Sequence, residues 1–217
     1  MNAVTKKDVY PLPRIDDTID RLQGASYFSS IDLASGYWQI EVDEKDREKT
    51  AFITPDGLYE FQVMPFGLCN APATFQRMMD LVLADLKWTT CLVYLDDVIV
   101  FSTTFSQHLE RLESVLRCIQ EAGLTLKSSK CQFGSRKLKI LGHVVSAEGV
   151  SPDLDKTRAV ADFRRPANIK DIRSFLGLCS YYRRFVKDFA KIAKPLTHLT
   201  KNNVPFVWKH EQENAFR

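Results

Sequence analysis

The stretch Cys91-Leu-Val-Tyr-Leu-Asp-Asp-Val-Ile-Val-Phe101 carries two adjacent carboxylates inside an otherwise apolar run. On either side stand short segments, 91–94 and 98–101, that are rich in β-branched and aromatic residues. This pattern predicts two buried strands that meet at a tight acidic turn. A charged group in apolar surroundings needs a partner. A bound cation is the simplest partner for Asp96 and Asp97, and a solvated hairpin tip is the plainer alternative.

A third acid stands in a similar setting. Asp32 sits at the end of a second run, 27–31, that is also predicted to be a strand. Three carboxylates at strand ends of one sheet could hold two Mg²⁺ ions, because this hard cation prefers oxygen ligands and bridges substrate phosphates. The pattern does not establish that the two strands are neighbours.

The rest of the chain alternates between helical and strand patterns. Apolar spacing, turn residues and caps predict the following elements: a helix over 15–22, a strand over 25–31, a hairpin of 50–54 and 58–64 around Pro55-Asp56-Gly57, a helix over 71–86 capped by Asn70, a helix over 106–122 closed by Gly123, and a strand over 138–145. Beyond a boundary at 149–153 come helical patterns over 155–163 and 169–189, and then a proline-bearing segment that ends at 204–208.

Composition restricts the class of protein. The 217 residues are 45% hydrophobic and 26% charged, with 9 Gly and 9 Pro, which is typical of a globular protein and excludes disordered, collagen-like and small disulfide-rich chains. No run approaches the roughly 20 apolar residues of a membrane span, and residues 1–7 lack a signal-peptide layout. We therefore expect a soluble, intracellular protein. The 5 cysteines are scattered without metal-ligand spacing, which favours reduced, mostly buried thiols over a zinc site.

Charge is distributed unevenly along the chain. Residues 1–150 hold 16 Lys and Arg against 20 Asp and Glu, whereas residues 151–217 hold 14 against 7. A basic segment is often only a solvated face. Beside a segment with clustered acids it favours a polyanionic partner.

At this point several motifs carry a resemblance to a known family. Tyr94-Leu95-Asp96-Asp97 resembles the Y-x-D-D motif of reverse transcriptases, and Asp32-Leu-Ala-Ser-Gly-Tyr37 resembles their earlier catalytic motif. Three further motifs follow in family order: Met64-Pro-Phe-Gly-Leu-Cys-Asn-Ala-Pro-Ala-Thr-Phe-Gln76, Lys130-Cys-Gln-Phe133 and Leu141-Gly-His143. With Tyr10-Pro-Leu-Pro-Arg-Ile-Asp-Asp17, they are most similar to Pol polyproteins of gypsy-class long-terminal-repeat retrotransposons.

The resemblance implies an α+β fold, in which a palm of antiparallel sheet and packed helices precedes a helical thumb. On this basis residues 1–150 are the palm with a remnant of the fingers, 151–203 the thumb, and 204–217 the start of a connection segment. The fingers would lie upstream of Met1 and a ribonuclease H domain beyond Arg217. The chain is therefore expected to be a piece of a Pol polyprotein.

By residue match, Asp32 and Asp96 would bind two Mg²⁺ ions, with Asp97 assisting and Mn²⁺ as an alternative metal. Lys130 resembles the late palm lysine of the family, which can donate a proton to pyrophosphate. An ordinary exposed lysine is the competing interpretation.

Six residues match substrate positions of the family. Ser35 and Gly36 would present backbone N–H groups to the triphosphate. The Tyr37 ring would exclude a ribose 2′ hydroxyl, or it is a core aromatic. Phe66 would pack against the incoming sugar, and Tyr94 and Leu95 would lie at the primer terminus.

The nucleic-acid contacts are expected between residues 140 and 184. Ile140, Leu141 and Gly142 match the primer-grip turn of the family, but they also fit an ordinary strand end. Arg173, Gly177 and Tyr181 are spaced i, i+4 and i+8 along one helical stripe, which suits a duplex minor groove or, alternatively, close helix packing. Arg183 and Arg184 would bind phosphates without sequence specificity.

The resemblance implies an RNA-directed DNA polymerase, a nucleotidyltransferase that acts on an RNA or DNA template with a primer and on dNTPs, without a membrane. It would work in the cytoplasm, or in a virus-like particle if the element is complete. Two alternatives are a non-catalytic nucleic-acid-binding remnant and a generic two-metal nuclease or phosphotransferase. The isolated 217 residues are expected to bind duplex without extending a primer.

Overall fold

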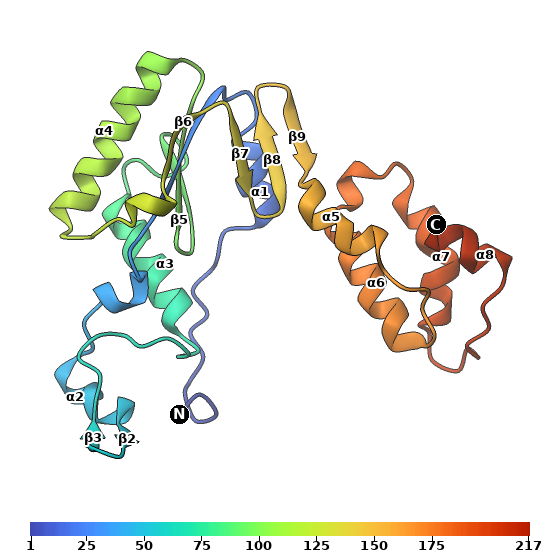
Figure 1. Cartoon of the computed structure of the whole chain (residues 1–217), viewed down its shortest axis with the longest axis horizontal. Coiled ribbons are helices and arrows are strands. Elements are labelled where there is room, and N and C mark those ends of the chain that lie inside the picture. The colour runs from blue at the N-terminus through green and yellow to red at the C-terminus, as the bar shows by residue number, and fades with distance from the viewer. The chain divides into compact units, whose positions relative to one another are not determined.

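The computed structural model describes all 217 residues, which form two compact units. The first contains Met1–Leu138 and Val145–Val150, and the second contains Lys139–Val144 and Ser151–Arg217. The first unit is built on a sheet with helices, whereas the second is mainly helical (Figure 1). These elements confirm the predicted α+β class.

A four-stranded sheet in the order β4-β5-β1-β6 is the frame of the first unit. Its strands are β1 (Tyr27–Asp32), β4 (Cys91–Tyr94), β5 (Asp97–Ser102) and β6 (Gln132–Ser135). The pairs β1/β5, β4/β5 and β1/β6 are all antiparallel. The predicted strands around the acidic pair are therefore confirmed, and β1 lies directly beside β5.

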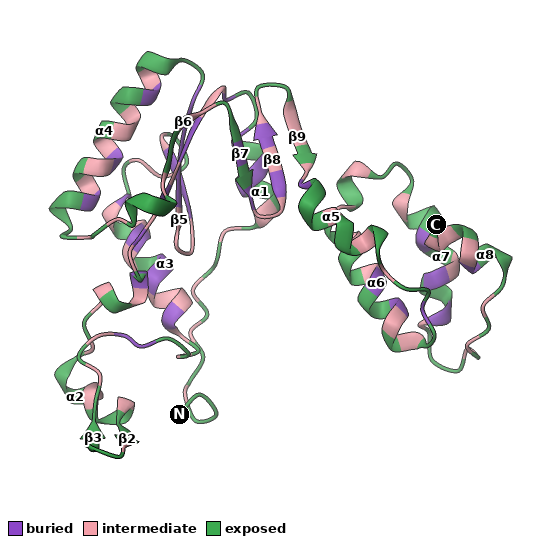
Figure 2. Ribbon diagram, viewed as in Figure 1, coloured by how far each residue is buried: buried purple, intermediate pink, exposed green.

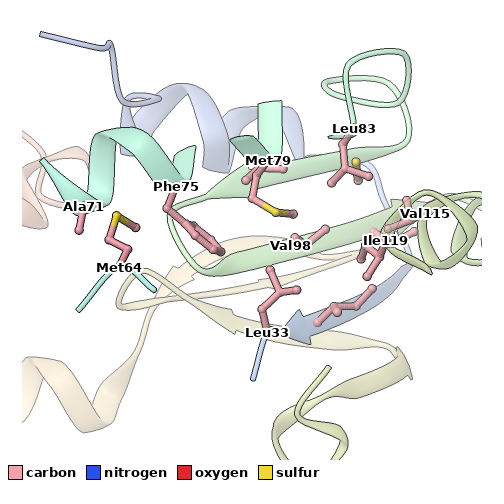
Figure 3. Close-up of a cluster of buried hydrophobic side chains, with 13 residues drawn as sticks. Leu33, Met64, Ala71, Phe75, Met79, Leu83, Val98, Val115 and Ile119 are labelled. Atoms are coloured by element: carbon pink, nitrogen blue, oxygen red, sulfur yellow. The ribbon is translucent and has the colours of Figure 1, made fainter. Parts of the chain in front are cut away.

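Helices α3 (Ala71–Val82) and α4 (Phe105–Glu121) cover this sheet, and α1 (Ile15–Arg21) precedes β1. Phe75 and Met79 from α3 and Val115 and Ile119 from α4 join strand residues such as Val98 in one buried cluster (Figure 3). Burying such side chains is the main source of folding free energy. In Figure 2 the buried residues accordingly concentrate on the strands and on parts of the helices.

The predicted hairpin exists but is shorter than expected. It consists of β2 (Phe52–Thr54) and β3 (Gly57–Tyr59), and it follows η1 (Gly36–Gln39), α2 (Glu44–Arg47) and η2 (Glu48–Thr50). The stretch 60–64 leaves the hairpin because its backbone bonds elsewhere: Val42 N donates to Gln62 O at 2.8 Å, and Met64 N to Ile40 O at 2.8 Å.

Two details of α3 differ from the sequence prediction. The helix ends at Val82, and tight turns follow in which Leu86 N bonds Leu83 O at 3.0 Å. Asn70 does not cap the helix with its side chain. Its amide instead accepts from Asp8 N at 3.0 Å and donates to Lys6 O at 2.9 Å, so it binds the N-terminal segment.

The prediction of a single strand over 138–145 is wrong. Strands β7 (Lys137–Ile140) and β8 (His143–Ser146) flank Leu141 and Gly142, and with β9 (Gly149–Pro152) they form a sheet in the order β7-β8-β9. Leu141 has φ 46° and Gly142 φ 69°. Two consecutive left-handed residues form the tight turn of a two-residue hairpin, which reverses the chain.

The second unit contains α5 (Leu154–Ala161), α6 (Ile169–Tyr181), η4 (Arg183–Phe185), α7 (Phe189–Leu199) and α8 (His210–Phe216), and η3 (Ser128–Lys130) belongs to the first. Ile172, Phe175, Leu196 and Leu199 are its buried core, and Phe206, Trp208 and Phe216 pack against them. The predicted helix over 169–189 is wrong in its second half: α6 ends at Tyr181, the short η4 follows, and then Val186 is extended with φ -112° and ψ 109° and Asp188 is left-handed with φ 56°, so no continuous helix reaches residue 189.

Residues 204–217 lie in the same compact unit as α5–α7, so the domain boundary at 203 stays a prediction. No helix has the length and apolar character needed to span a membrane. The five cysteines form no disulfide, but only Cys91 is buried and Cys69 is exposed, so the expectation of mostly buried thiols is wrong.

A buried histidine gives the first unit a pH-dependent stability. His108 is 1% exposed, and its Nε2 lies 2.7 Å from Ser29 Oγ. Burial, assisted by the charge of Arg111, lowers the pKa of His108 below 6.5.

Because of this lowered pKa, the unfolded chain binds a proton at His108 more readily than the folded chain does. The free energy of unfolding is therefore highest above about pH 6.5, and it falls as the pH decreases towards the pKa of His108 in the folded state. We expect a loss of up to about 1.4 kcal/mol per pH unit in this window, absent in His108→Gln, when urea unfolding is measured from pH 7.5 to 5.

Candidate active site

The sheet brings the three predicted acids together. Asp32 on β1 is the register partner of Asp97 on β5, and Tyr94 on β4 pairs with Asp97 across the β4/β5 turn. We call Tyr94–Asp97 the acidic turn. Leu95 has a left-handed φ of 53°, so Leu95 and Asp96 reverse the chain directly beside the end of β1. Neighbouring strands, which the sequence pattern left open, are thus established.

Burial and the closeness of the three carboxylates together disfavour negative charge at this edge of the sheet. Burial raises the pKa of Asp96, and the nearby charge of Asp32 adds to this rise. Burial also raises the pKa of Asp97, with further contributions from Asp32 and Asp96, whereas Lys130 acts in the opposite direction on both. Asp96 Oδ1 is buried and has no hydrogen-bond partner. This edge therefore favours a cation.

Lys130 lies close to these acids. Its Nζ is 3.4 Å from Asp32 Oδ2, with the lysine side chain 57% exposed. As the side chains stand, no three His, Cys, Asp or Glu residues are grouped so as to hold a metal ion. Lys130 thus forms an ion pair with Asp32 while most of its side chain stays exposed, so both the catalytic and the ordinary exposed-lysine interpretation stay open.

Ser35, Gly36 and Tyr37 follow β1 and its Asp32. Ser35 has a left-handed φ of 50°, and Gly36 begins η1. A Cβ atom on Gly36 would lie 2.7 Å from Cζ of Phe75 and 3.6 Å from Asp96 Oδ1. Gly36 is therefore required for packing on α3, a reason that the sequence did not reveal, in addition to the predicted approach to phosphate.

Gly36→Ala should destabilise the first unit. Phe75 is fully buried and cannot move aside, so the added methyl group overpacks the core at a cost of about 1–3 kcal/mol. Gly177→Ala is the matched control: a Cβ there meets nothing within 4 Å, and alanine in an exposed helix should add up to about 1 kcal/mol. Urea unfolding of both variants measures the two opposite effects, and an unchanged midpoint for Gly36→Ala would contradict the packing argument.

Tyr37 joins the core to the surface. Its ring centroid lies 5.6 Å from that of buried Phe75 and 5.3 Å from that of Phe66, which is 58% exposed. Burial, and then the charge of Asp96, raise the pKa of Tyr37. The ring of Tyr37 therefore packs on a core aromatic and also contacts an exposed aromatic, and its role in excluding a 2′ hydroxyl stays a prediction.

Sequence reasoning missed one residue that touches the acidic turn. Gln76 on α3 is fully buried, and its Oε1 accepts a 2.8 Å hydrogen bond from Leu95 N. A signal was present, since Gln76, Met79 and Leu83 share the i, i+3, i+7 spacing of one apolar face. A polar residue on such a face must find a partner.

In the second unit, the turn at Leu141 and Gly142 is held by two tyrosines. Tyr181 Oη donates to Leu141 O at 2.6 Å, and Tyr182 Oη donates to Gly142 O at 3.2 Å. His143 is buried among these rings. Tyr181 therefore has a structural hydrogen bond that the stripe hypothesis did not include. Ile140 is buried beside this turn, and its predicted nucleic-acid contact stays a prediction.

The other candidate contacts of this unit are accessible. Arg173 and Gly177 are exposed on α6, two turns and one turn before Tyr181, as the spacing predicted. Arg173 Nη2 donates to Thr200 O at 3.3 Å. Arg183 and Arg184 are exposed in η4, after the end of α6, and not on the continuous helix that was expected.

Comparison with known proteins identifies the family. Residues 1–145 match the family described as "Reverse transcriptase (RNA-dependent DNA polymerase)". The chain belongs to the reverse transcriptase family. This assignment confirms the resemblance carried by the acidic turn and the motif that begins at Asp32.

Curated relatives of this reverse transcriptase segment are retrotransposon polyproteins. It is 45% identical over 201 residues to "Retrovirus-related Pol polyprotein from transposon 297" of Drosophila melanogaster, covering 93% of this chain and 19% of that protein. It is 42% identical to the corresponding polyprotein of the transposon gypsy, covering all of this chain and 22% of that protein. The chain thus spans about a fifth of the length of these relatives.

Solved structures of foamy viral protease-reverse transcriptase resemble the whole chain. One, in complex with double-stranded DNA, has a TM-score of 0.89 and 25% identity over 99% of this chain and 38% of the other. Another, in complex with an RNA/DNA hybrid, has a TM-score of 0.82 and 25% identity over 99% of this chain and 29% of the other. The reverse transcriptase fold is therefore present throughout these residues.

Proposed function

We propose that this segment forms the catalytic part of an RNA-directed DNA polymerase, which transfers a nucleotide from a dNTP to a primer 3′ hydroxyl. One observation carries the proposal: Asp32 and Asp97 are register partners, and Asp96 stands beside them with a buried oxygen that lacks a partner. Residues 1–150 are then the palm, and residues 151–203 are the thumb. The enzyme would work in the cytoplasm or in a virus-like particle.

The donor set fits divalent metal ions. Asp32 and Asp96, assisted by Asp97, would hold Mg²⁺ or Mn²⁺, since carboxylate oxygens are the ligands that these hard cations prefer. When bound, two such ions make the 3′ hydroxyl a better nucleophile and neutralise the triphosphate. The raised pKa values of Asp96 and Asp97 support the proposal, because carboxylates that are buried and also repel one another are stabilised in their ionised form by a cation.

The remaining residues orient the reactants. The backbone N–H groups of Ser35 and Gly36 are proposed to receive the triphosphate, and Tyr37 with Phe66 to pack against its sugar. Tyr94 and Leu95 would support the primer terminus. Lys130, 3.4 Å from Asp32, is placed to give a proton to the leaving pyrophosphate.

The second unit is proposed to hold the primer-template. The exposed groups of α6 and η4 and the turn at residues 141–142 would contact the backbone of the duplex, which fixes register without reading sequence. The residues concerned are Leu141, Gly142, Arg173, Gly177, Tyr181, Arg183 and Arg184.

Primer extension tests the activity. Because the chain spans about a fifth of its curated relatives, the assay uses a Pol product that includes the flanking segments as well. We expect Mg²⁺-dependent DNA synthesis on both RNA and DNA templates. Duplex binding without extension would contradict the proposal and favour a non-catalytic nucleic-acid-binding remnant.

The basic residues of η4 predict a salt effect on duplex binding. Each neutralised phosphate contributes about 0.9 to the slope of log K against log salt. Replacing both Arg183 and Arg184 with serine should therefore flatten the slope by up to about two units without altering sequence preference. The matched control replaces two exposed basic residues of the first unit, Lys45 and Arg117. Equal slopes for wild type and the Arg183/Arg184 variant would show that this pair faces solvent in the complex.

A further inference from the structure

The acidic turn has an unfavourable backbone that must be held in place. Leu95 is a bulky residue in the left-handed region, with φ 53°. Bulky L-residues rarely adopt this conformation, and it persists only where the surroundings impose it. The same peptide leads into Asp96, so the conformation of Leu95 determines where the carboxylate of Asp96 lies.

The side-chain amide of Gln76 contacts the backbone of this turn on both sides of Tyr94. Its Oε1 accepts from Leu95 N at 2.8 Å, and its Nε2 lies 3.4 Å from Val93 O. The side chain is fully buried on α3. Since a buried polar group without partners is costly, both ends of this amide are committed to the turn and to its neighbours.

The orientation of the amide is set by Asp80. Gln76 Nε2 donates to Asp80 Oδ1 at 2.9 Å. An ionised carboxylate only accepts, so the NH₂ group must face Asp80 and the carbonyl oxygen must face Leu95 N–H. Burial raises the pKa of Asp80, but Lys87, Tyr10 and Gln76 lower it by more, so this carboxyl stays ionised.

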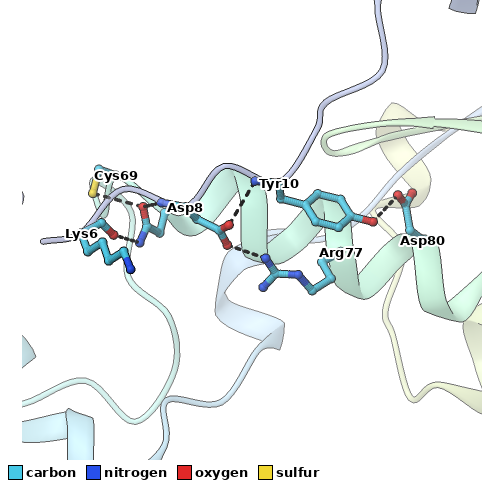
Figure 4. Close-up of polar contacts among 7 residues, drawn as sticks. Lys6, Asp8, Tyr10, Cys69, Arg77 and Asp80 are labelled. Carbon is cyan, nitrogen blue, oxygen red and sulfur yellow. Dashed lines mark hydrogen bonds and ion pairs between the residues drawn. The ribbon is translucent and has the colours of Figure 1, made fainter.

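Asp80 is in turn fixed from two directions. Lys87 Nζ lies 2.6 Å from its Oδ2, and Tyr10 Oη donates to the same oxygen at 2.7 Å. Tyr10 belongs to the N-terminal segment, which runs along α3 and is tied to it by the Asp8–Arg77 ion pair at 2.6 Å (Figure 4). A continuous chain of contacts therefore runs from Tyr10 through Asp80 and Gln76 to Leu95.

We infer that Gln76 is a positioning residue for the acidic turn, that Asp80 fixes its orientation, and that Tyr10 couples the N-terminal segment to the catalytic carboxylates. Only the expected effect on kcat rests on the proposed polymerase function. The contacts that hold the acidic turn can be tested in the 217 residues alone.

Amide hydrogen exchange of Leu95, followed by NMR on the 217-residue chain, tests the geometry directly. Gln76→Met keeps the volume but removes the acceptor, and it should speed exchange at Leu95 about tenfold, the factor expected for the loss of one buried hydrogen bond. Exchange at Ile99 and Val100 in the middle of β5 should not change. Unchanged exchange at Leu95 would overturn the inference.

Two milder variants leave the buried glutamine in place and serve if Gln76→Met fails to fold. Asp80→Asn removes the charge that orients the amide, and Tyr10→Phe removes only one hydrogen bond to Asp80. Both should speed exchange at Leu95, Asp80→Asn by more. Asp85→Asn is the matched control, because Asp85 is an exposed acid of the same region. Equal exchange in all three variants would overturn the coupling.

Metal affinity supplies a second readout that does not depend on turnover. Mn²⁺ binding, measured by electron paramagnetic resonance, should weaken several-fold in Gln76→Met and stay at the wild-type value in Asp85→Asn. In the longer Pol product, Gln76→Met should lower kcat while the duplex Kd stays constant. A wild-type protein that fails to extend primers would reject the proposed function, whereas the exchange result would still decide the role of Gln76.

Discussion

Asp96→Asn is expected to reduce Mg²⁺-dependent nucleotide addition by the Pol product about a thousandfold. The substitution keeps the size of the side chain but removes a metal carboxylate, which forfeits several kcal/mol of transition-state stabilisation, at about 1.4 kcal/mol per factor of ten in rate. Steady-state primer extension measures the effect. A loss of less than tenfold would contradict the assignment of Asp96 as a ligand.

The structure also predicts what this variant does to stability. Burial and the charge of Asp32 raise the pKa of Asp96, which means that the folded state disfavours its ionised form. The asparagine side chain carries no charge, so the free energy of unfolding of Asp96→Asn at pH 7 should equal or exceed that of wild type. Lost activity with retained stability separates a catalytic role from misfolding. Asp56→Asn, in the exposed turn of the β2/β3 hairpin, is the control for activity.

The local part of this site could be read from the sequence. Two short apolar runs around Asp96 and Asp97 have the composition of buried strands, and the structure confirms them as β4 and β5. The pairing of Asp32 with Asp97 could not be derived from the pattern, because residues 65 positions apart meet only through the register of β1 with β5. The family resemblance supplied that neighbourhood.

Two of the wrong predictions concern where a strand or a helix ends. Apolar periodicity describes which face of an element is buried, but it does not show where the backbone enters the left-handed region. Leu141 has a positive φ value in the middle of the predicted strand over 138–145, which divides there in two. The predicted helix over 169–189 ends at Tyr181, and further along it Val186 is extended and Asp188 has a positive φ value. Gly142 indicated a turn beside Leu141, whereas nothing in the sequence indicated that the helix over 169–189 would end early.

The hydrogen-bond partners of polar side chains also could not be predicted from the sequence. Asn70 has the residue type of a helix cap, yet its side chain binds the N-terminal segment, since Lys6 O and Asp8 N lie within reach. The partner of Gln76 was equally hidden, because it is a backbone N–H of a strand turn 19 residues away. Sequence spacing shows that a buried polar group needs a partner, but only the fold shows which one.

Tyr37→Ala is expected to relax discrimination against ribonucleotides about ten- to hundredfold. The aromatic ring stands between Phe66 and the core, near Asp96, where it would clash with a 2′ hydroxyl, and relieving an overpacked contact of about 1–3 kcal/mol gives this factor. Addition of deoxynucleotides should stay within about one factor of ten, because the truncation removes a clash and little attraction. Tyr37→Phe should retain discrimination, and Trp38→Ala, which removes the neighbouring exposed ring, is the matched control. Competing incorporation of rNTP and dNTP by the Pol product measures the ratio; an unaltered ratio accompanied by lower stability would make Tyr37 a core aromatic only.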